Sequence, residues 1–183
     1  MKTNSEVKVK VCKKQTTIPA SMRDQTLRKF SDVCGKPKQH YQVSTKYLHP
    51  SRPIHIIIDE PRNNQAKKYT VTTTTGYARD SDTQQSIISS VEGDIHDLVS
   101  SLGLQPHHSW IEKGWFFSQD GLTIKVFSVF NVNEENLDPE NLVVSIESIS
   151  AIATYQSDDA KQRIELLYSK ILNDRLAYAP RKD

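Results

Sequence analysis

The sequence predicts an α+β fold: a single, mainly antiparallel β-barrel of about eight strands with flanking helices. A length of 183 residues suits one domain with a sizeable core, so residues 1–183 are expected to form one unit. Strand-like segments follow one another through connections of hairpin length, which favours antiparallel pairing. One hairpin, at residues 110–130, is apolar on both faces, as expected for a barrel wall covered by helices.

The first strand is expected at residues 6–12, where valines alternate with lysines. A helix should follow, because Thr17 can cap it, Pro19 suits its first turn and Gly35 can end it. Between these limits, five residues recur at helical spacing: Met22, Thr26, Phe30, Val33 and Cys34.

The middle of the chain is expected to form four more strands. Residues 40–48 alternate with a period of two, and residues 54–59 are almost continuously apolar. Residues 68–77 are rich in Thr, Val and Tyr, a composition typical of strands, and a further strand is expected at residues 86–91. Polar turns are expected between these strands at residues 49–53, 61–65 and 79–83.

The second half begins with a short helix, which Asp94 can cap and Gly103 can end. An extended aromatic segment at 108–117 and a strand at 122–130 flank a tight-turn signal at Gln119-Asp120-Gly121. An acidic loop at 131–140, a long strand at 142–155 and an amphipathic helix at 157–175 complete the pattern, and a polar tail follows residue 176.

The hairpin at 110–130 should present two different apolar faces. One face should fill the barrel interior, while the other must be covered by a helix or by another chain. Trp110, Glu112, Gly114 and Phe116 should share one face, and Ile111, Lys113, Trp115 and Phe117 the other.

Charge and hydropathy exclude several classes of protein. The 24 Lys and Arg nearly balance the 22 Asp and Glu, so a net charge of +2 gives no strong attraction to nucleic acid or membranes. Apolar runs are too short to span a membrane, and the first residues lack a secretory signal core. Basic residues concentrate in 1–79 and acidic ones in 80–183, which predicts either a solvated basic surface or a patch for an acidic partner.

No catalytic, cofactor-binding or metal-binding residues are predicted. The phosphate-loop, dinucleotide-binding and serine-elbow patterns do not occur in the sequence. Cys12 and Cys34 lack the spacing of a zinc site and are expected to be free, at least partly buried thiols. His107 and His108 have no carboxylate or cysteine at ligand spacing.

The strands are also compatible with two other functions, that of a polyphosphate-processing enzyme and that of a nucleic-acid-binding module. A polyphosphate-processing barrel would need alternating glutamates on an inward face to hold a divalent metal, yet Glu6 and Glu147 each stand alone. The segment Lys113–Phe117 is similar to an RNA-recognition motif but lacks its second glycine. A metal-dependent polyphosphate or RNA 5′-triphosphate hydrolase of the triphosphate-tunnel type remains the second hypothesis, and a nucleic-acid-binding module the third.

The order of three segments resembles the subunit 18 family of the Mediator head module. These are the helix Asp94–Gly103, the extended segment His108–Phe117 and the strand Gly121–Phe127. The strand Leu142–Ser148 and the helix at 157–175 take the places of that family's long strand and terminal amphipathic helix. The resemblance covers residues 94–175 and is topological over 1–93.

The resemblance implies a barrel shaped like the metal-dependent RNA triphosphatases but without enzymatic function or cofactor. It implies a heterodimer with Mediator subunit 20, binding of the C-terminal helix of subunit 8, and contact with other head subunits and RNA polymerase II in the nucleus. It implies neither direct sequence-specific binding of nucleic acid nor membrane association.

The leading hypothesis is therefore a non-enzymatic scaffold subunit that acts as a transcriptional coactivator through protein–protein interactions. Buried aromatic side chains supply much of the affinity in such interfaces, and an apolar groove can accept a partner helix. The predicted partner-binding residues are Trp110, Trp115 and Phe116.

Overall fold

The computed structural model describes residues 2–51, 55–60, 68–77, 83–93, 95–151 and 157–172. In chain order its elements are β1 (Lys2–Pro19), a 3₁₀ turn (Ala20–Met22), α1 (Arg23–Cys34), β2 (Lys38–Leu48), β3 (His55–Asp59), β4 (Lys68–Tyr77), β5 (Thr83–Glu92), α2 (Ile95–Ser101), β6 (Gln105–Gln119), β7 (Leu122–Phe130), β8 (Asn141–Ala151) and α3 (Ser157–Leu172).

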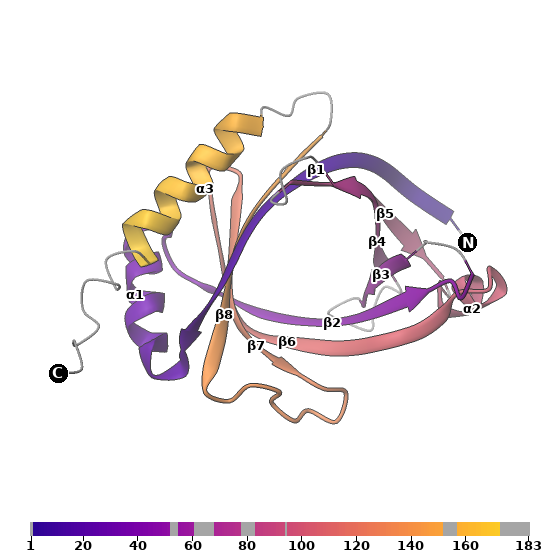
Figure 1. Ribbon diagram of the computed structural model, residues 1–183, viewed down its shortest axis with the longest axis horizontal. Helices are drawn as coiled ribbons and strands as arrows, with labels where there is room; N and C mark the ends of the chain where they lie inside the picture. The colour runs from indigo at the N-terminus through magenta and orange to yellow at the C-terminus, as the bar shows by residue number, and fades with distance from the viewer. Residues whose placement is uncertain are drawn as a thin grey trace.

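The strands form a closed antiparallel barrel in the order β1-β5-β4-β3-β2-β6-β7-β8 (Figure 1). Helices α1 and α3 lie together at one end of the barrel wall, and α2 lies at the other end. The predicted fold class, an antiparallel barrel of about eight strands with flanking helices, is confirmed.

The first strand is much longer than predicted, and the helix after it begins later. β1 pairs with β5 through Cys12 and with β8 from Val9 to Pro19, so it links two parts of the barrel. The prediction that Thr17 caps a helix is wrong, because Thr17 lies in this ladder opposite Val143. Backbone pairing with β8 therefore outweighs the local helix signal, and α1 begins only at Arg23.

The β6–β7 hairpin has the turn that its sequence predicts. Asp120 and Gly121 both have positive φ angles, 49° and 76°, as a type I′ turn requires. Further along, a Cβ atom on Gly114 would lie 2.1 Å from the carbonyl oxygen of Val126. The close approach of β6 to β7 at this point therefore requires glycine.

The remaining strands agree closely with the sequence pattern. β4 and β7 have the predicted bounds, and the helices α2 and α3 lie where amphipathic segments are predicted. The turns at 61–65 and 79–82, the Asp94 cap, residues 152–155 of the predicted long strand, residues 173–175 of the predicted last helix and the tail lie outside the described residues.

The larger apolar core lies outside the barrel, between its wall and the two helices α1 and α3. Phe30 of α1 packs on Phe117 of β6 with ring centroids 5.5 Å apart. Residues from β7 and β8 and the apolar stripe of α3 complete this outer core: Leu122, Ile124, Val126, Val144, Ile146, Ile164, Leu167 and Ile171. Each fully buried aliphatic side chain stabilises the fold by ~1.5–3 kcal/mol.

A smaller core fixes α2 at the opposite end. Ile95 and Val99 of α2 pack against Tyr47, Ile58 and Val91 from three strands. The Tyr47 hydroxyl lies 2.6 Å from Nδ1 of His96, and the Tyr69 ring meets His96 edge-on. The helix α2 is therefore held by both apolar packing and a polar contact.

Two further sequence expectations can be compared with the structure. Cys12 is buried and Cys34 half-buried, and neither forms a disulfide, as predicted. Among the helices of the described residues, none is long and apolar enough to cross a membrane.

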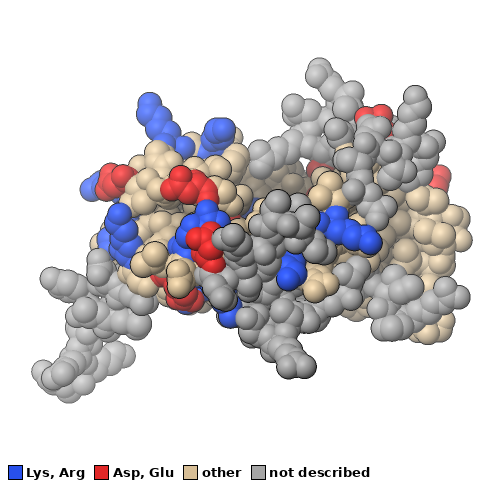
Figure 2. All heavy atoms as spheres, turned by 90° about the horizontal axis from the view of Figure 1, so that it is seen from above, with Lys and Arg blue, Asp and Glu red and all other residues tan. Residues whose placement is uncertain are grey.

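Figure 2 shows cationic and acidic side chains interspersed over the end that carries α3, without a continuous field of one sign.

Candidate functional site

The barrel interior holds a cluster of ionisable side chains, because alternate residues of each strand point inward. On β8, Val144 and Ile146 belong to the outer core, so Ser145 and Glu147 face the interior. Glu147 lies 3.1 Å from Nζ of Lys13 on β1 and 3.9 Å from Nζ of Lys125 on β7. The Ser145 hydroxyl also donates to Glu147, at 2.9 Å. Glu147 is therefore the centre of a polar group shared by three strands.

A second carboxylate, Glu112 of β6, faces the same interior. Its Oε2 lies 2.9 Å from Nε2 of His40 on β2, and its Oε1 accepts a hydrogen bond of 3.2 Å from the indole of Trp110. The His40 ring is buried and packs edge-on against Phe127, with ring centroids 5.9 Å apart. These contacts fix the position of Glu112 from two directions.

The environment holds these two glutamates in their ionised form. Burial acts to raise the pKa of Glu147, but the charges of Lys125 and Lys13 outweigh it and keep that pKa below the ordinary value. Burial also acts to raise the pKa of Glu112, but the hydrogen bond from His40 and the charge of Lys125 lower it. Lys125 therefore stabilises both carboxylates.

Asp59 behaves in the opposite way. It ends β3, and its Oδ1 accepts a hydrogen bond of 2.6 Å from the buried Ser44 hydroxyl. Burial raises the pKa of Asp59 and exceeds the lowering effect of Ser44 and Lys125. The interior therefore contains two stabilised carboxylates and one that is destabilised when ionised.

A cavity of about 370 Å³ opens onto this cluster. Lys13, His108, Trp110, Glu112, Phe127 and Val143 are among the residues that line it. His108 stacks on Trp110, with centroids 5.7 Å apart and the rings nearly parallel. Among the described residues, no three His, Cys, Asp or Glu side chains gather as a metal-ligand cluster.

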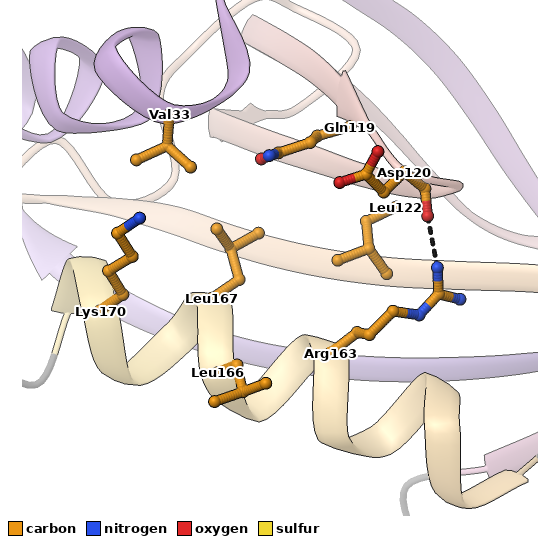
Figure 3. A pocket seen from close by; sticks show the side chains of 8 residues that line it. All are labelled: Val33, Gln119, Asp120, Leu122, Arg163, Leu166, Leu167 and Lys170. Atoms are coloured by element: carbon orange, nitrogen blue, oxygen red, sulfur yellow. Dashed lines mark hydrogen bonds between the residues drawn. The ribbon is translucent and has the colours of Figure 1, made fainter.

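A separate groove of about 330 Å³ lies between the helices α1 and α3 and the β6–β7 turn (Figure 3). Leu167 points from α3 towards Leu122 and Val33, and these side chains form the apolar floor. Leu166 on the neighbouring position of α3 is 69% exposed. An apolar floor beside an exposed leucine is typical of a helix-binding surface.

Two cations border this α1–α3 groove. Arg163 donates from its guanidinium to the carbonyl oxygen of Asp120 (Figure 3). Its Nε also pairs with Asp159, at 3.1 Å. Lys170 lies two helical turns further along α3, at the other end of the groove. The groove is therefore apolar in the middle and has a cation at each end, and Asp120 also lines it beside Arg163.

The three predicted partner-binding residues do not form one patch. Trp110 faces the interior cavity and bonds Glu112, whereas half-buried Trp115 faces outward, 5.8 Å from the guanidinium of Arg23. Phe116 is half-buried, with Nζ of Lys38 5.8 Å from its ring. Strand alternation therefore separates Trp115 from the other two, and their role in partner binding stays a prediction.

The interior cluster is a feature that the sequence interpretation missed. The sequence pattern presents Glu147 as a lone acid and Glu112 as one residue of a hairpin face, and it predicts no role in a site for Lys13, Lys125 or His40. The available signal was the presence of charged residues at alternate positions of strands that are otherwise apolar. Their pairing depends on cross-strand register, which local patterns do not specify.

Comparisons with solved structures identify the same barrel in several proteins. A chain of the Schizosaccharomyces pombe Mediator head module matches with a TM-score of 0.66 and 12% identity, over 92% of this chain and 96% of that one. A conserved hypothetical protein from Pyrococcus furiosus matches with a TM-score of 0.59 and 20% identity, over 91% of this chain and 90% of the other.

A third similar structure is a putative adenylyl cyclase from Hippeastrum, described as having a dominant triphosphatase activity. It has a TM-score of 0.51 and 11% identity, over 91% of this chain and 87% of that one. No family model matches the sequence, and comparison with curated proteins gives no match. At these identities, the similarity establishes the fold.

Proposed function

We propose that this chain is a non-enzymatic scaffold subunit of a Mediator head-type complex and a coactivator of RNA polymerase II transcription in the nucleus. In this role it forms a heterodimer with a subunit 20-type barrel and binds the C-terminal helix of a subunit 8-type partner. Other head subunits and the polymerase are the further partners. It acts by protein–protein interaction, without a cofactor, sequence-specific nucleic acid binding or a membrane.

The observation that carries the proposal is the way the interior carboxylates are used. Glu147 is paired with Lys13 and Lys125, and Glu112 with His40, so each carboxylate already has a partner within the chain. A divalent metal in a hydrolytic site needs several oxygen ligands from one place. Carboxylates that balance the chain's own cations instead stabilise the barrel as a structural element.

The fold likeness supports the same proposal. The structural match to a chain of the S. pombe Mediator head module covers nearly the whole of both chains, with a TM-score of 0.66. The segment order from residue 94 onward, which resembles the subunit 18 family, lies on α2, β6, β7, β8 and α3 of this barrel.

The α1–α3 groove is the proposed binding site for the partner helix. An amphipathic helix would place apolar side chains on Leu166, Leu167 and Leu122 and acidic side chains beside Arg163 and Lys170. The burial of one exposed leucine contributes ~1.5–3 kcal/mol. Because Leu166 is 69% exposed, it is available to a partner without any change in the fold.

Co-purification from nuclear extract in moderate salt tests the proposal. We expect tagged full-length protein to retain Mediator head subunits, and Leu166→Asp to lose the helical partner. Gln162→Asp is the matched control, since it places the same charge on an exposed position of α3 one turn away. Recovery of the chain alone, or equal recovery with both variants, would contradict the proposal.

A triphosphate-tunnel hydrolase is the second candidate, favoured by the Hippeastrum relative of this fold and by the two lysines in the interior. The discriminating measurement is phosphate release from nucleoside triphosphate, inorganic triphosphate and 5′-triphosphorylated RNA with Mg²⁺ or Mn²⁺. Turnover that is abolished by Glu147→Gln would replace the scaffold proposal with this one.

A further inference from the structure

A second groove, of about 420 Å³, lies on the barrel wall away from the α1–α3 groove. It runs between the start of α1, the strands β2, β6 and β7, and the start of β8. The side chains that define this aromatic groove are Arg23, Tyr41, Lys113, Trp115, Phe130 and Leu142.

The aromatic groove combines an aromatic floor with two cations. Nζ of Lys113 lies 4.9 Å from the centre of the Phe130 ring and 5.8 Å from that of Tyr41, while the guanidinium of Arg23 lies 5.8 Å from the centre of the Trp115 ring. Cations over ring faces are held in place without losing their capacity to bind an anion. Among the described residues that line the groove, two are permanent cations and none is acidic.

The present partners of these cations are exposed carboxylates, which another acid can replace at low cost. Arg23 pairs with Asp24 at 2.8 Å, and the Asp24 side chain is 78% exposed. Lys113 pairs with Glu134 at 3.0 Å, and Glu134 belongs to the β7–β8 loop. Exposed ion pairs of this kind contribute little to stability, so exchange for an incoming carboxylate is nearly neutral.

From this arrangement we infer that the aromatic groove is a docking site for a short peptide segment of another protein in which acidic residues alternate with aromatic or aliphatic ones. The apolar side chains of the segment pack on Tyr41, Trp115 and Phe130. Its carboxylates bind Arg23 and Lys113 in place of Asp24 and Glu134. The site is distinct from the α1–α3 groove, and the inference does not depend on the identity of any complex.

The surroundings favour a peptide over a nucleic acid. The loop beside Lys113 carries Glu134, Glu135, Asp138 and Glu140, which repel a continuous phosphate backbone. A peptide with two or three separated carboxylates avoids most of this repulsion. The same loop exposes Val132 at 60% and Leu137 at 54%, which adds apolar surface beside the cations.

The test uses the full-length protein and three fluorescent probes of ten units each. These are a peptide alternating Asp with Phe or Leu, the same peptide with Lys in place of Asp, and a single-stranded RNA. We expect anisotropy to show the acidic peptide binding at least about tenfold more tightly than the lysine peptide and the RNA. Equal binding of the two peptides, tighter binding of the RNA, or no binding of the acidic peptide overturns the inference.

Matched variants locate the site. Arg23→Glu with Lys113→Glu should weaken binding of the acidic peptide by about tenfold or more. Arg28→Glu with Lys36→Glu makes the same change in net charge at exposed positions outside the groove and should leave binding within about twofold. Equal weakening by both pairs would mean that only overall charge matters, which overturns the assignment.

The two tryptophans supply a second measurement that does not depend on these variants. Trp115 lines the aromatic groove, whereas Trp110 lines the interior cavity. Titration of wild-type protein with the acidic peptide should shift the indole ¹⁵N–¹H signal of Trp115 and leave that of Trp110 unchanged. A shift of Trp110 alone would place the peptide in the barrel interior and overturn the inference.

Discussion

The two faces of strands β7 and β8 are built on opposite principles. Outward residues such as Ile124 and Ile146 are fully buried and belong to the apolar outer core. Inward residues one position away, such as Lys125 and Glu147, are charged and rely on partners from neighbouring strands of the barrel. The outer face supplies stability through buried area, whereas the inner face is tolerated only because its charges are matched.

The two faces should therefore tolerate different kinds of substitution. In the outer core, the cost of a substitution should follow the volume removed, since no specific partner is lost. In the interior, the cost should follow whether a partner remains unpaired, so two substitutions together can cost less than one. The three predictions below test this contrast, from the largest expected effect to the smallest.

Phe30→Ala should cause the largest loss of stability. Phe30 has no exposed surface and packs on Phe117 within the outer core, so its removal leaves a cavity beneath α1. We expect the free energy of unfolding to fall by ~3–5 kcal/mol, measured by urea denaturation. Leu166→Ala, at an exposed position of the same end, is the control and should stay within ~0.5 kcal/mol of wild type. A loss below that of the interior variants would contradict the contrast.

Glu147→Leu should have an intermediate effect that a second substitution reverses. Alone, it removes the carboxylate that lies 3.9 Å from the amine of Lys125, whose side chain is only 26% exposed, and we expect a loss of ~1–3 kcal/mol. Glu147→Leu with Lys125→Met should return to within ~1 kcal/mol of wild type, because an apolar pair replaces the ionic one. Lys13 is 43% exposed and can be solvated in both variants.

Denaturation of Glu147→Leu, of Lys125→Met and of the double variant in parallel provides the measurement. A double variant that is as unstable as the two single changes combined would mean that the interior behaves like the outer core, with independent contributions. The contrast between the faces would then fail, even if the single substitution had the expected effect.

Sequence patterns were sufficient for elements whose signals are local. The bounds of β4 and β7 could be predicted because both segments are rich in β-branched residues. The turn signal at Asp120-Gly121 also marks the start of β7. The second half of β1 could not be predicted, since the sequence from Lys13 to Pro19 is polar and becomes a strand only by pairing with β8. Long-range pairing, not local preference, determines its conformation.

The same limit applied to the candidate site. Lys13 and Glu147 are at opposite ends of the chain and meet because their strands are paired in one register. A shift of β1 by one residue along β8 would turn Lys13 to the outer core and away from Glu147, so the site depends on a relation that alternation alone does not contain. Local patterns identify the aromatic residues of the hairpin. Which of them face the barrel interior and which face outward also depends on the strand register.

The smallest predicted effect is the pH dependence of folding stability that comes from three interior carboxylates, and its sign differs among them. The pKa values of Glu112 and Glu147 are lowered in the folded state, so they contribute stability above their unfolded pKa of about 4.3, and this is lost as the pH falls through the folded values. Burial raises the pKa of Asp59, so its contribution is present below about pH 3.9 and is lost as the pH rises through the folded value.

Amide variants separate these two cases because they keep the shape of each side chain and remove its charge. Asp59→Asn retains an oxygen that can accept from Ser44, and it should raise the free energy of unfolding at pH 7 by on the order of 1 kcal/mol. Glu147→Gln should lower it at pH 7, because Lys13 and Lys125 lose their counter-charge, and should converge with wild type in acid. Unfolding measured from pH 3 to pH 8 gives both signs in one experiment, and a loss of stability in Asp59→Asn at pH 7 would show that Asp59, like the two glutamates, is stabilised as a carboxylate by the cations of the interior.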